Sequence, residues 1–394
     1  MKLACVVQRY GADIAGGSEA HCRQIAERLA ASHDVTVLTT CARDYVTWAN
    51  AYPPGDARER GVRVIRFPVR HERRLKRFAD LSDVVFDGRA SEADQEAWFR
   101  ENGPEAPDLL AHLAAHGSEY DLVLFWTFRY APSYFGLPLV ADRAVLVPTA
   151  EDDAALNLDV LQSYFRRAAG YLFLTPEEQA LVSARAAQPL EPAAIIGLGL
   201  DPAPPPSDRA PLQALGLPED YVLYLGRVDR NKGCHTLFEY FQDYAAQAAE
   251  VATTLVLAGP ATIPVPAHPR IRALGYVSND VRHALLSHAR ALLVPSPYES
   301  LSIVLLEAWN QAVPALVNAH CSVLHGQVRR ANGGLFYRSS REFAEALGAL
   351  LAEPRLAAAL GRQGLTYVEQ EYRWPIVLGR VEALMAEVRA RRGC

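Results

Sequence analysis

The sequence predicts an α/β protein made of two doubly wound, Rossmann-like domains. Its 394 residues suit two domains better than one. In both halves, apolar strand-like runs alternate with helix-like segments, which is typical of parallel sheets covered by helices. A stretch rich in Pro and Gly at 197–211 separates the halves. We therefore expect an N-terminal domain at 1–197 and a C-terminal domain at 198–374, facing each other across a ligand cleft.

In the N-terminal half, the first elements are a strand, a loop and a helix. The apolar run Leu3–Gln8 is typical of a buried strand, and Arg9–Gly17 is expected to be a loop. Ser18–Ala31 is expected to be a helix, because its apolar residues recur at core spacing and Ser18 is a suitable N-cap. Further strands are expected at Val35–Thr39, Val62–Phe67, Asp121–Trp126, Ala144–Pro148 and Tyr171–Thr175.

The C-terminal half repeats this alternation and ends in a long helix. Its strands and helices are expected at Tyr221–Leu225, Gly233–Ala249, Thr254–Ala258, Ala291–Pro295, Ser302–Gln311 and Pro314–Val317. The tail at 375–394 is expected to be one amphipathic helix with Pro375 in its first turn. Its apolar face consists of Val377, Val381, Leu384, Met385 and Val388. Because such a face needs a partner surface, we expect this helix to return to the N-terminal domain.

The composition argues against several classes of protein. A net charge of −5 and a pI of about 6.1 give no sign of a nucleic-acid partner. Six cysteines, at 5, 22, 41, 234, 321 and 394, form neither a CxxC pair nor a zinc spacing, so we expect thiols in a reducing cytosol. The N-terminus lacks a signal-peptide core, and no apolar run is long enough for a transmembrane helix. We therefore expect a cytoplasmic protein.

Loops that follow strands are expected to carry the function, because open parallel sheets bind ligands outside the carboxyl ends of their strands. These loops are Gly11–Gly17, Thr149–Asp153, Gly226–Gly233, Gly259–Thr262 and Ser296–Ser302.

The loop Gly226–Gly233 follows a strand and opens a helix. Its two cations, Arg227 and Lys232, can neutralise a diphosphate, since Arg adds bidentate geometry and Lys a compact charge. The alternative, a solvated basic turn, stays open at this point.

The segment Tyr298–Glu307 contains two glutamates eight positions apart. Glu299 lies in the loop after a strand, Ser300 or Ser302 can cap the following helix, and Glu307 lies inside that helix. A helix N-terminus offers free N–H groups and a positive dipole, which suit a phosphate. The two carboxylates can then bind hydroxyls at opposite ends of a nucleotide sugar.

These motifs resemble a known family. The E-x7-E spacing preceded by LLVPSPYES, together with YLGRVDRNKG and LGYVSND, is similar to the retaining GT-B glycosyltransferases of family 4. The resemblance covers most of the chain, from the Gly16-Gly17 loop to the closing helix. It implies transfer of a sugar from a nucleotide sugar, with a UDP-sugar favoured. It also implies that no metal or other cofactor is needed, because two cations replace the metal.

The resemblance implies a role for each matching position. Arg227 and Lys232, in the loop that begins at Gly226, would hold the donor diphosphate. Glu307 would bind the ribose hydroxyls, and Glu299 the hydroxyls of the donor sugar. Further donor contacts are implied for the backbone of Tyr276, Val277, Ser300, Leu301 and Ser302 and for the glycine loop at Gly16 and Gly17. For the two glycines, an ordinary turn before a helix is the alternative.

One segment departs from the family pattern. Many relatives carry a histidine in the acceptor-side loop, where this chain has Glu151, Asp152 and Asp153. These acids either contact a sugar or acceptor hydroxyl, with Glu151 or Asp152 as the catalytic candidate, or form a solvated helix start. The histidine's role is therefore not carried over directly.

Basic residues crowd the segment 58–77. Nine of them are Arg58, Arg60, Arg63, Arg66, Arg70, Arg73, Arg74, Lys76 and Arg77. Attraction to an anionic membrane or a lipid-linked diphosphate acceptor is one interpretation, and a solvated face with strand arginines is the other. A peripheral position at the inner face of a membrane follows only from the first.

The function expected is a retaining glycosyltransferase of glycan or glycolipid biosynthesis, with a carbohydrate, lipid-linked or small-molecule acceptor. Alternatives are a non-catalytic nucleotide-sugar-binding protein and an epimerase or phosphorylase on the same fold. A nicotinamide dehydrogenase is disfavoured, because no GxGxxG follows the first strand.

Overall fold

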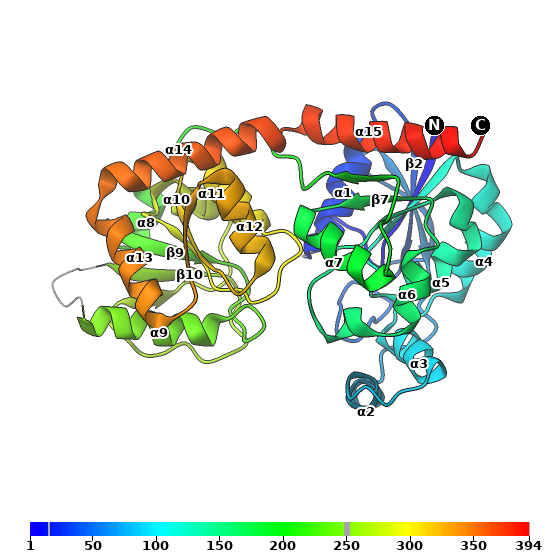
Figure 1. The fold of residues 1–394 in the computed structure, drawn as a ribbon, viewed down its shortest axis with the longest axis horizontal. Coiled ribbons are helices and arrows are strands. Elements are labelled where there is room, and N and C mark those ends of the chain that lie inside the picture. The colour runs from blue at the N-terminus through cyan, green and yellow to red at the C-terminus, as the bar shows by residue number, and fades with distance from the viewer. Residues whose placement is uncertain (15, 248–252, 394) are drawn as a thin grey trace. The chain divides into compact units, whose positions relative to one another are not determined.

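A computed structural model describes residues 1–14, 16–247 and 253–393. The chain divides into two compact units. Unit 1 consists of Met1–Gly197 and Leu378–Cys394, and unit 2 of Leu198–Val377. Each unit has one sheet with helices on both faces (Figure 1). Three expectations touch positions outside the described residues: the end of the helix Gly233–Ala249, the cysteine at 394 and position 15 of the glycine loop.

Unit 1 contains an eight-stranded sheet with the order β3-β4-β2-β1-β5-β6-β7-β8. The strands are β1 Lys2–Val6, β2 Asp34–Thr40, β3 Gly55–Glu59, β4 Val62–Phe67, β5 Leu122–Trp126, β6 Ala144–Val147, β7 Gly170–Phe173 and β8 Ala193–Ile195. The helices are α1 Gly17–Leu29, α2 Leu75–Phe86, α3 Glu92–Asn102, α4 Pro107–His116, α5 Ala131–Gly136, α6 Val160–Phe165 and α7 Pro176–Ala186, with short 3₁₀ turns η1 Gly117–Glu119, η2 Leu137–Arg143 and η3 Ala154–Asn157.

The six strands expected in this half are all present, which confirms the doubly wound class. The central strands β1, β5 and β6 are buried along their length, as continuous apolar runs predict for a sheet covered on both faces. Two edge strands, β3 and β8, were not expected, because β3 is mostly polar and β8 has only three residues, none of them fully buried. The sheet is also not purely parallel, since β3 pairs with β4 in antiparallel orientation.

The start of α1 differs from the expectation. The N-cap is Gly16 rather than Ser18, and it makes no side-chain cap hydrogen bond. The Ser18 hydroxyl instead donates to Glu19 Oε2 at 2.9 Å and accepts from Gln8 Nε2 at 3.2 Å. The Ser18 hydroxyl therefore binds Glu19 and Gln8 at once and does not cap the helix.

Unit 2 contains a six-stranded parallel sheet with the order β11-β10-β9-β12-β13-β14. The strands are β9 Tyr221–Leu225, β10 Thr254–Ala258, β11 Ile271–Ala273, β12 Leu292–Val294, β13 Ala315–Asn318 and β14 Gly334–Tyr337. The helices are α8 Ala210–Ala214, α9 Cys234–Gln247, α10 Asn279–His288, α11 Ile303–Asn310, α12 Ser322–Ala331, α13 Ser340–Ala352 and α14 Pro354–Glu371. The four expected strands form the middle of the sheet, and the short edge strands β11 and β14 were not foreseen.

The closing helix α15 runs over Trp374–Arg391 and belongs to unit 1 from Leu378 onward. All five residues of its predicted apolar face are buried. A β-carbon added at Gly170, on β7, would lie 2.5 Å from Val388 Cγ2, so the helix packs directly on the strand. The tail therefore covers the unit 1 sheet, as its apolar face predicted.

Candidate functional site

In each unit, the loops singled out from the sequence follow strand carboxyl ends. In unit 1 these are the loops after β1 and β6. In unit 2 they are the loops after β9, β10 and β12. Because all strands of unit 2 are parallel, its three loops emerge at the same edge of one sheet.

Two glycines bring the loops after β9 and β10 into contact. Gly226 and Gly259 have φ of 140° and 146°, and a β-carbon on Gly259 would lie 2.0 Å from the Gly226 carbonyl oxygen. Gly226 N also donates to Ala258 O at 3.0 Å. Only glycine at 259 fits such a close approach to the backbone of Gly226, where the basic loop starts.

Asp229 organises the two cations of this loop. It is 7% exposed, accepts the Lys232 backbone N–H at 2.7 Å and forms an ion pair with Arg227 Nε. From the strand below, the Tyr224 hydroxyl donates to the Arg227 carbonyl at 2.7 Å. The loop is thus held by internal contacts, which disfavours a loosely solvated turn.

Lys232 connects this loop to the loop after β12. Its Nζ donates to Glu299 Oε1 at 2.9 Å, with side chains 32% and 13% exposed. A β-carbon on Gly233, where φ is 72°, would lie 2.4 Å from Pro295 O. The structure therefore brings Arg227, Lys232 and Glu299 together at one edge of the sheet.

The N-terminus of α11 follows directly from Glu299. Ser302 is its N-cap but makes no side-chain cap hydrogen bond. The buried Ser302 hydroxyl has no partner among the described residues, and its backbone N–H donates to Gln327 Oε1 at 3.3 Å. Leu301 is 7% exposed, so any ligand contact there comes from its backbone. A buried hydroxyl without a partner, at a helix N-terminus, suits an anionic ligand.

Glu307 lies within α11 and is held from the neighbouring helix α10. Arg282 Nη1 donates to Glu307 Oε1 at 2.9 Å, and Arg282 Nη2 to its other oxygen. The pair is 34% and 23% exposed, so the carboxylate is oriented but still reached by solvent. Bidentate pairing of this kind fixes the plane of the carboxylate.

Tyr276 and Val277 lie in the loop between β11 and α10. Tyr276 is 86% exposed. Its neighbour Gly275 accepts a hydrogen bond from Gly259 N at 2.8 Å, so this loop adjoins the one after β10.

In unit 1, the glycine loop has a packing reason of its own. Arg9 Nε donates to Glu19 Oε1 at 2.9 Å, and both side chains are buried. A β-carbon on Gly16 would lie 2.2 Å from Glu19 Oε2, whereas one on Gly17 would meet nothing within 4 Å. A β-carbon at position 16 would therefore displace the Glu19 carboxylate of this buried ion pair, which gives the glycine a packing reason.

The three acids after β6, the acidic stretch at 151–153, have different environments. Asp153 caps η3 by accepting from Ala155 N at 3.1 Å and pairs with Arg129 Nη2 at 2.5 Å. The helix-start interpretation therefore holds for Asp153. Asp152 is exposed and Glu151 half-buried. Both remain candidates for acceptor contact.

The backbone around this stretch is strained. Thr127 and Thr149, which follow β5 and β6, have φ of 59° and 47°, unusual for residues with a β-carbon. Fully buried Glu178 accepts hydrogen bonds from Ala150 N at 2.7 Å and Leu174 N at 2.6 Å. Burial raises the pKa of Glu178 to about 8, although these backbone N–H groups oppose the shift.

Several residues at these sites were not predicted from the sequence. Asp229 had a signal, since it stands two positions after Arg227 in the same motif. Arg282 and Gln327 had none, because their partners are 25 positions away in sequence, and the partner that links Glu178 to the acidic stretch, Ala150, is 28 positions away. The lone histidine His21 is a packing residue: it is buried, it accepts from the Trp126 indole at 2.9 Å, and burial lowers its pKa to about 4.

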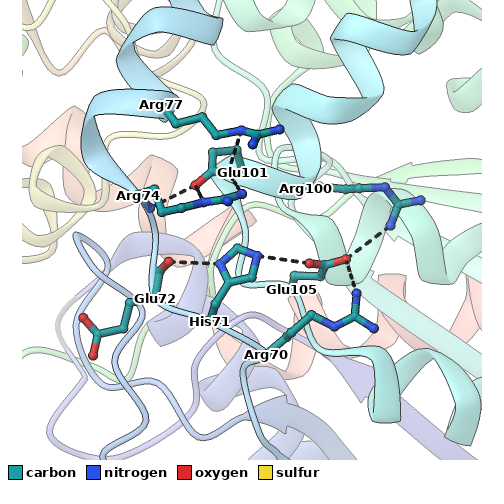
Figure 2. A network of polar contacts seen from close by, with 8 residues as sticks. All are labelled: Arg70, His71, Glu72, Arg74, Arg77, Arg100, Glu101 and Glu105. Carbon is teal, nitrogen blue, oxygen red and sulfur yellow. Dashed lines mark hydrogen bonds and ion pairs between the residues drawn. The ribbon is translucent and has the colours of Figure 1, made fainter.

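The basic segment is largely engaged with acids. Arg63 pairs with Asp56 and Arg66 with Glu59. Further along, four arginines and His71 surround two glutamates (Figure 2). These are Arg70, Arg74, Arg77 and Arg100 around Glu101 and Glu105. These arginines are therefore held by ion pairs while most of their side chains remain exposed to solvent.

In the described part of the chain, no cluster of three or more His, Cys, Asp or Glu side chains is arranged to hold a metal ion. Within the same residues, no helix combines the length and apolarity needed to span a membrane.

Comparison with known families gives one match. The family model for glycosyl transferases group 1 matches residues 219–353, about a third of the chain, which includes the loops from Gly226 to Glu307. This match confirms the resemblance over that region and supports glycosyltransferase activity. No curated protein sequence matches this chain.

Solved structures show the fold of the whole chain. Sucrose-phosphate synthase from Thermosynechococcus elongatus is 22% identical, with a TM-score of 0.72 over 99% of this chain and 100% of that one. Anabaena HepE in complex with UDP is 16% identical, with a TM-score of 0.71 over 98% and 100%. Trehalose 6-phosphate synthase from Burkholderia multivorans is 14% identical, with a TM-score of 0.74 over 99% and 100%. At these identities, the likeness establishes the GT-B fold.

Proposed function

We propose that this chain transfers a glycosyl group from a UDP-sugar to an acceptor hydroxyl with retention of configuration. The proposal rests on one observation: Arg227, Lys232 and Glu299 lie beside the N-terminus of α11, inside the region that matches the glycosyl transferases.

The two cations are assigned to the donor diphosphate. A phosphate that meets Arg227, Lys232 and the free N–H groups of α11 is stabilised most as the bond to the sugar breaks, when its charge grows. An opposite-charge contact at a partly exposed site contributes roughly 4 kcal/mol before desolvation costs. Leaving-group stabilisation is therefore the main catalytic effect we assign to the chain, and it requires no metal.

The two glutamates are assigned to opposite ends of the donor. Glu299 Oε1 accepts a hydrogen bond from the Lys232 ammonium. We assign the other oxygen, Glu299 Oε2, to a hydroxyl of the transferred sugar. Glu307, oriented by Arg282, is assigned to the ribose. The backbone of 276–277 is assigned to the base, and uracil is favoured because the similar Anabaena structures contain UDP and UDP-glucose.

We assign the acceptor to unit 1, with Glu151 or Asp152 at its hydroxyl. Retention without a covalent intermediate places the incoming hydroxyl on the same face as the leaving phosphate, which assists its deprotonation. A nearby carboxylate then orients the acceptor hydroxyl rather than attacking the sugar. We place the reaction in glycan or glycolipid biosynthesis in the cytoplasm, with support from the buried free cysteines of the described residues.

The test is release of UDP from a panel of UDP-sugars, with and without candidate acceptor sugars, and NMR of the product. The expected result is UDP release that depends on an acceptor, and a product with the donor's anomeric configuration. An inverted product would contradict retention. Saturable UDP-sugar binding without turnover on any acceptor would favour a non-catalytic binding protein.

A further inference from the structure

An ion-pair network in unit 1 has more cations than its carboxylates need. It joins the loop after β4 and the start of α2 to the end of α3 (Figure 2). Six cationic residues stand against three carboxylates here, which leaves a net charge of +3 without His71. They are Arg70, Arg73, Arg74, Lys76, Arg77 and Arg100, against Glu72, Glu101 and Glu105. Two cations would be enough to balance the charges of Glu101 and Glu105, which we call the inner glutamates.

Two of the carboxylates, those of Glu101 and Glu105, are buried, and the guanidinium groups around them are not. The side chains of Glu101 and Glu105 are 2% and 10% exposed, whereas those of the four arginines around them are between 50 and 60% exposed. Glu101 accepts from Arg74 N at 2.9 Å and from Arg74 Nε at 3.1 Å. The inner glutamates thus fix the directions of the arginines while leaving most of each guanidinium toward solvent.

Each glutamate is shared between arginines. Arg77 Nε lies 3.4 Å from Glu101 Oε2, beside Arg74. Arg70 Nη1 and Arg100 Nη1 lie 3.6 and 3.4 Å from the same oxygen of Glu105. Figure 2 shows Arg70 and Arg100 reaching Glu105 from different sides. One arginine of each pair is therefore surplus to charge balance.

His71 contacts one of these carboxylates and a backbone carbonyl. Its Nε2 is 3.4 Å from Glu105 Oε2, and its Nδ1 is 3.0 Å from the Glu72 carbonyl. Both ring nitrogens of His71 therefore face oxygen atoms of the network.

The network adjoins the ligand edge of the unit 1 sheet. Arg73 Nε donates to Asn102 O at 3.0 Å, and its guanidinium lies over the Trp48 ring, 5.0 Å from the centroid, in the loop after β2. Asn102 Nδ2 donates to Arg129 O at 3.0 Å, in the loop after β5. The same arginine, Arg129, pairs with Asp153 of the acidic stretch. The cations therefore lie within a few contacts of the assigned acceptor loop.

We propose that Arg70, Arg74, Arg77 and Arg100 bind a phosphate group carried by the acceptor. This inference rests on the proposed function and adds the chemical class of its second substrate. Guanidinium groups match phosphate oxygens bidentately, and an array fixed by buried carboxylates loses little side-chain entropy on binding. The phosphate belongs either to a soluble phosphorylated sugar or to a lipid headgroup. On α2, the exposed Val84 and Phe86 stand beside Asp83 and Asp87, which favours the soluble source over an anionic membrane.

The test is calorimetric titration of inorganic phosphate into the full chain with saturating UDP, which blocks the assigned donor diphosphate site. The variant R70Q/R77Q removes one arginine from each glutamate and leaves Arg74 and Arg100 in place, so neither buried carboxylate loses all its partners. R70K/R77K keeps the charge. R89Q, in an exposed pair with Asp87, is the matched control for loss of charge.

We expect phosphate affinity to fall about tenfold or more in R70Q/R77Q, by less in R70K/R77K, and not at all in R89Q. Equal phosphate affinity in wild type and R70Q/R77Q would overturn the proposal. Sedimentation with phosphatidylglycerol vesicles and with phosphatidylcholine vesicles separates the two sources. Binding to phosphatidylglycerol vesicles that is lost in R70Q/R77Q indicates a lipid headgroup. Absence of such binding indicates a soluble phosphorylated acceptor. If wild type failed to bind UDP, the proposed function would fall, while phosphate titration without UDP would still report on the arginines.

Discussion

The Arg282–Glu307 pair gives the sharpest prediction about the donor site. If Glu307 binds the ribose, then Glu307→Gln removes a charge-assisted hydrogen bond while keeping the side chain's shape. A hydrogen bond to a charged group contributes about 1.5–3 kcal/mol, so UDP affinity is expected to fall about 10- to 100-fold. The Arg282 pair alone does not account for such a loss, because exposed pairs contribute about 0–1 kcal/mol.

The assay is calorimetric titration of UDP and 2′-deoxyUDP into wild type and E307Q. Wild type is expected to prefer UDP, and E307Q to bind the two nucleotides nearly equally. Arg282→Gln loosens the carboxylate without removing it, and is expected to lower UDP affinity by up to about fivefold. Glu345→Gln, in an exposed pair with Arg341, is the matched control and should bind UDP as wild type does. An unchanged preference for UDP in E307Q would refute the ribose assignment.

Three further predictions concern the surrounding loops. Gly259→Ala is expected to lower the free energy of unfolding by about 2–4 kcal/mol, because its β-carbon would lie 2.0 Å from Gly226 O at a φ of 146°; an unchanged urea midpoint would show that the loops yield easily. Replacing Glu151 by Gln and Asp152 by Asn is expected to reduce transfer by about tenfold or more and to change UDP affinity little; full turnover would exclude both acids from the acceptor side. Burial raises the pKa of the Glu178 carboxyl from an ordinary 4.5 to about 8, so its contribution to stability is complete below pH 4.5 and is lost as the pH rises through about 8. Urea unfolding at pH 5 and pH 8 should therefore show a smaller loss of unfolding free energy for Glu178→Gln than for wild type.

The positions of the strands could be predicted wherever a strand is buried on both faces. β9 and β10 end where the apolar runs end, because a continuous apolar run has no other stable place in such a sheet. The edge strands β3 and β11 have mostly exposed residues, so their sequences look like loops. Their pairing is decided by the strand beside them rather than by their own pattern.

The candidate site divides in the same way. Arg227, Lys232 and Glu299 stood out because the motif spacing places all three in loops at strand ends. Arg282 and Gln327 did not, because each acts through a contact with a residue 25 positions away. At Gly16 the phosphate contact stays a prediction, and the structure adds a packing reason for the glycine, the buried Arg9–Glu19 pair.

The basic segment shows what charge counting alone misses. The sequence displays its arginines, but Glu101 and Glu105 come from the next helix and its exit, about 30 positions later. Only the fold shows that these acids hold the cations in place, which turns a diffuse patch into a site with a defined ligand class.

The central claim is that the loop Gly226–Gly233 binds the donor diphosphate. Titration of UDP into wild type, Arg227→Gln, Lys232→Gln and Arg230→Gln tests it most directly, because Arg230 is an exposed arginine of the same loop and has no assigned ligand contact. We expect wild type and R230Q to bind UDP alike, and R227Q and K232Q each to lose about tenfold or more in affinity, with turnover falling about 100-fold. Absence of UDP binding in wild type, or equal affinity in all four proteins, would contradict the account.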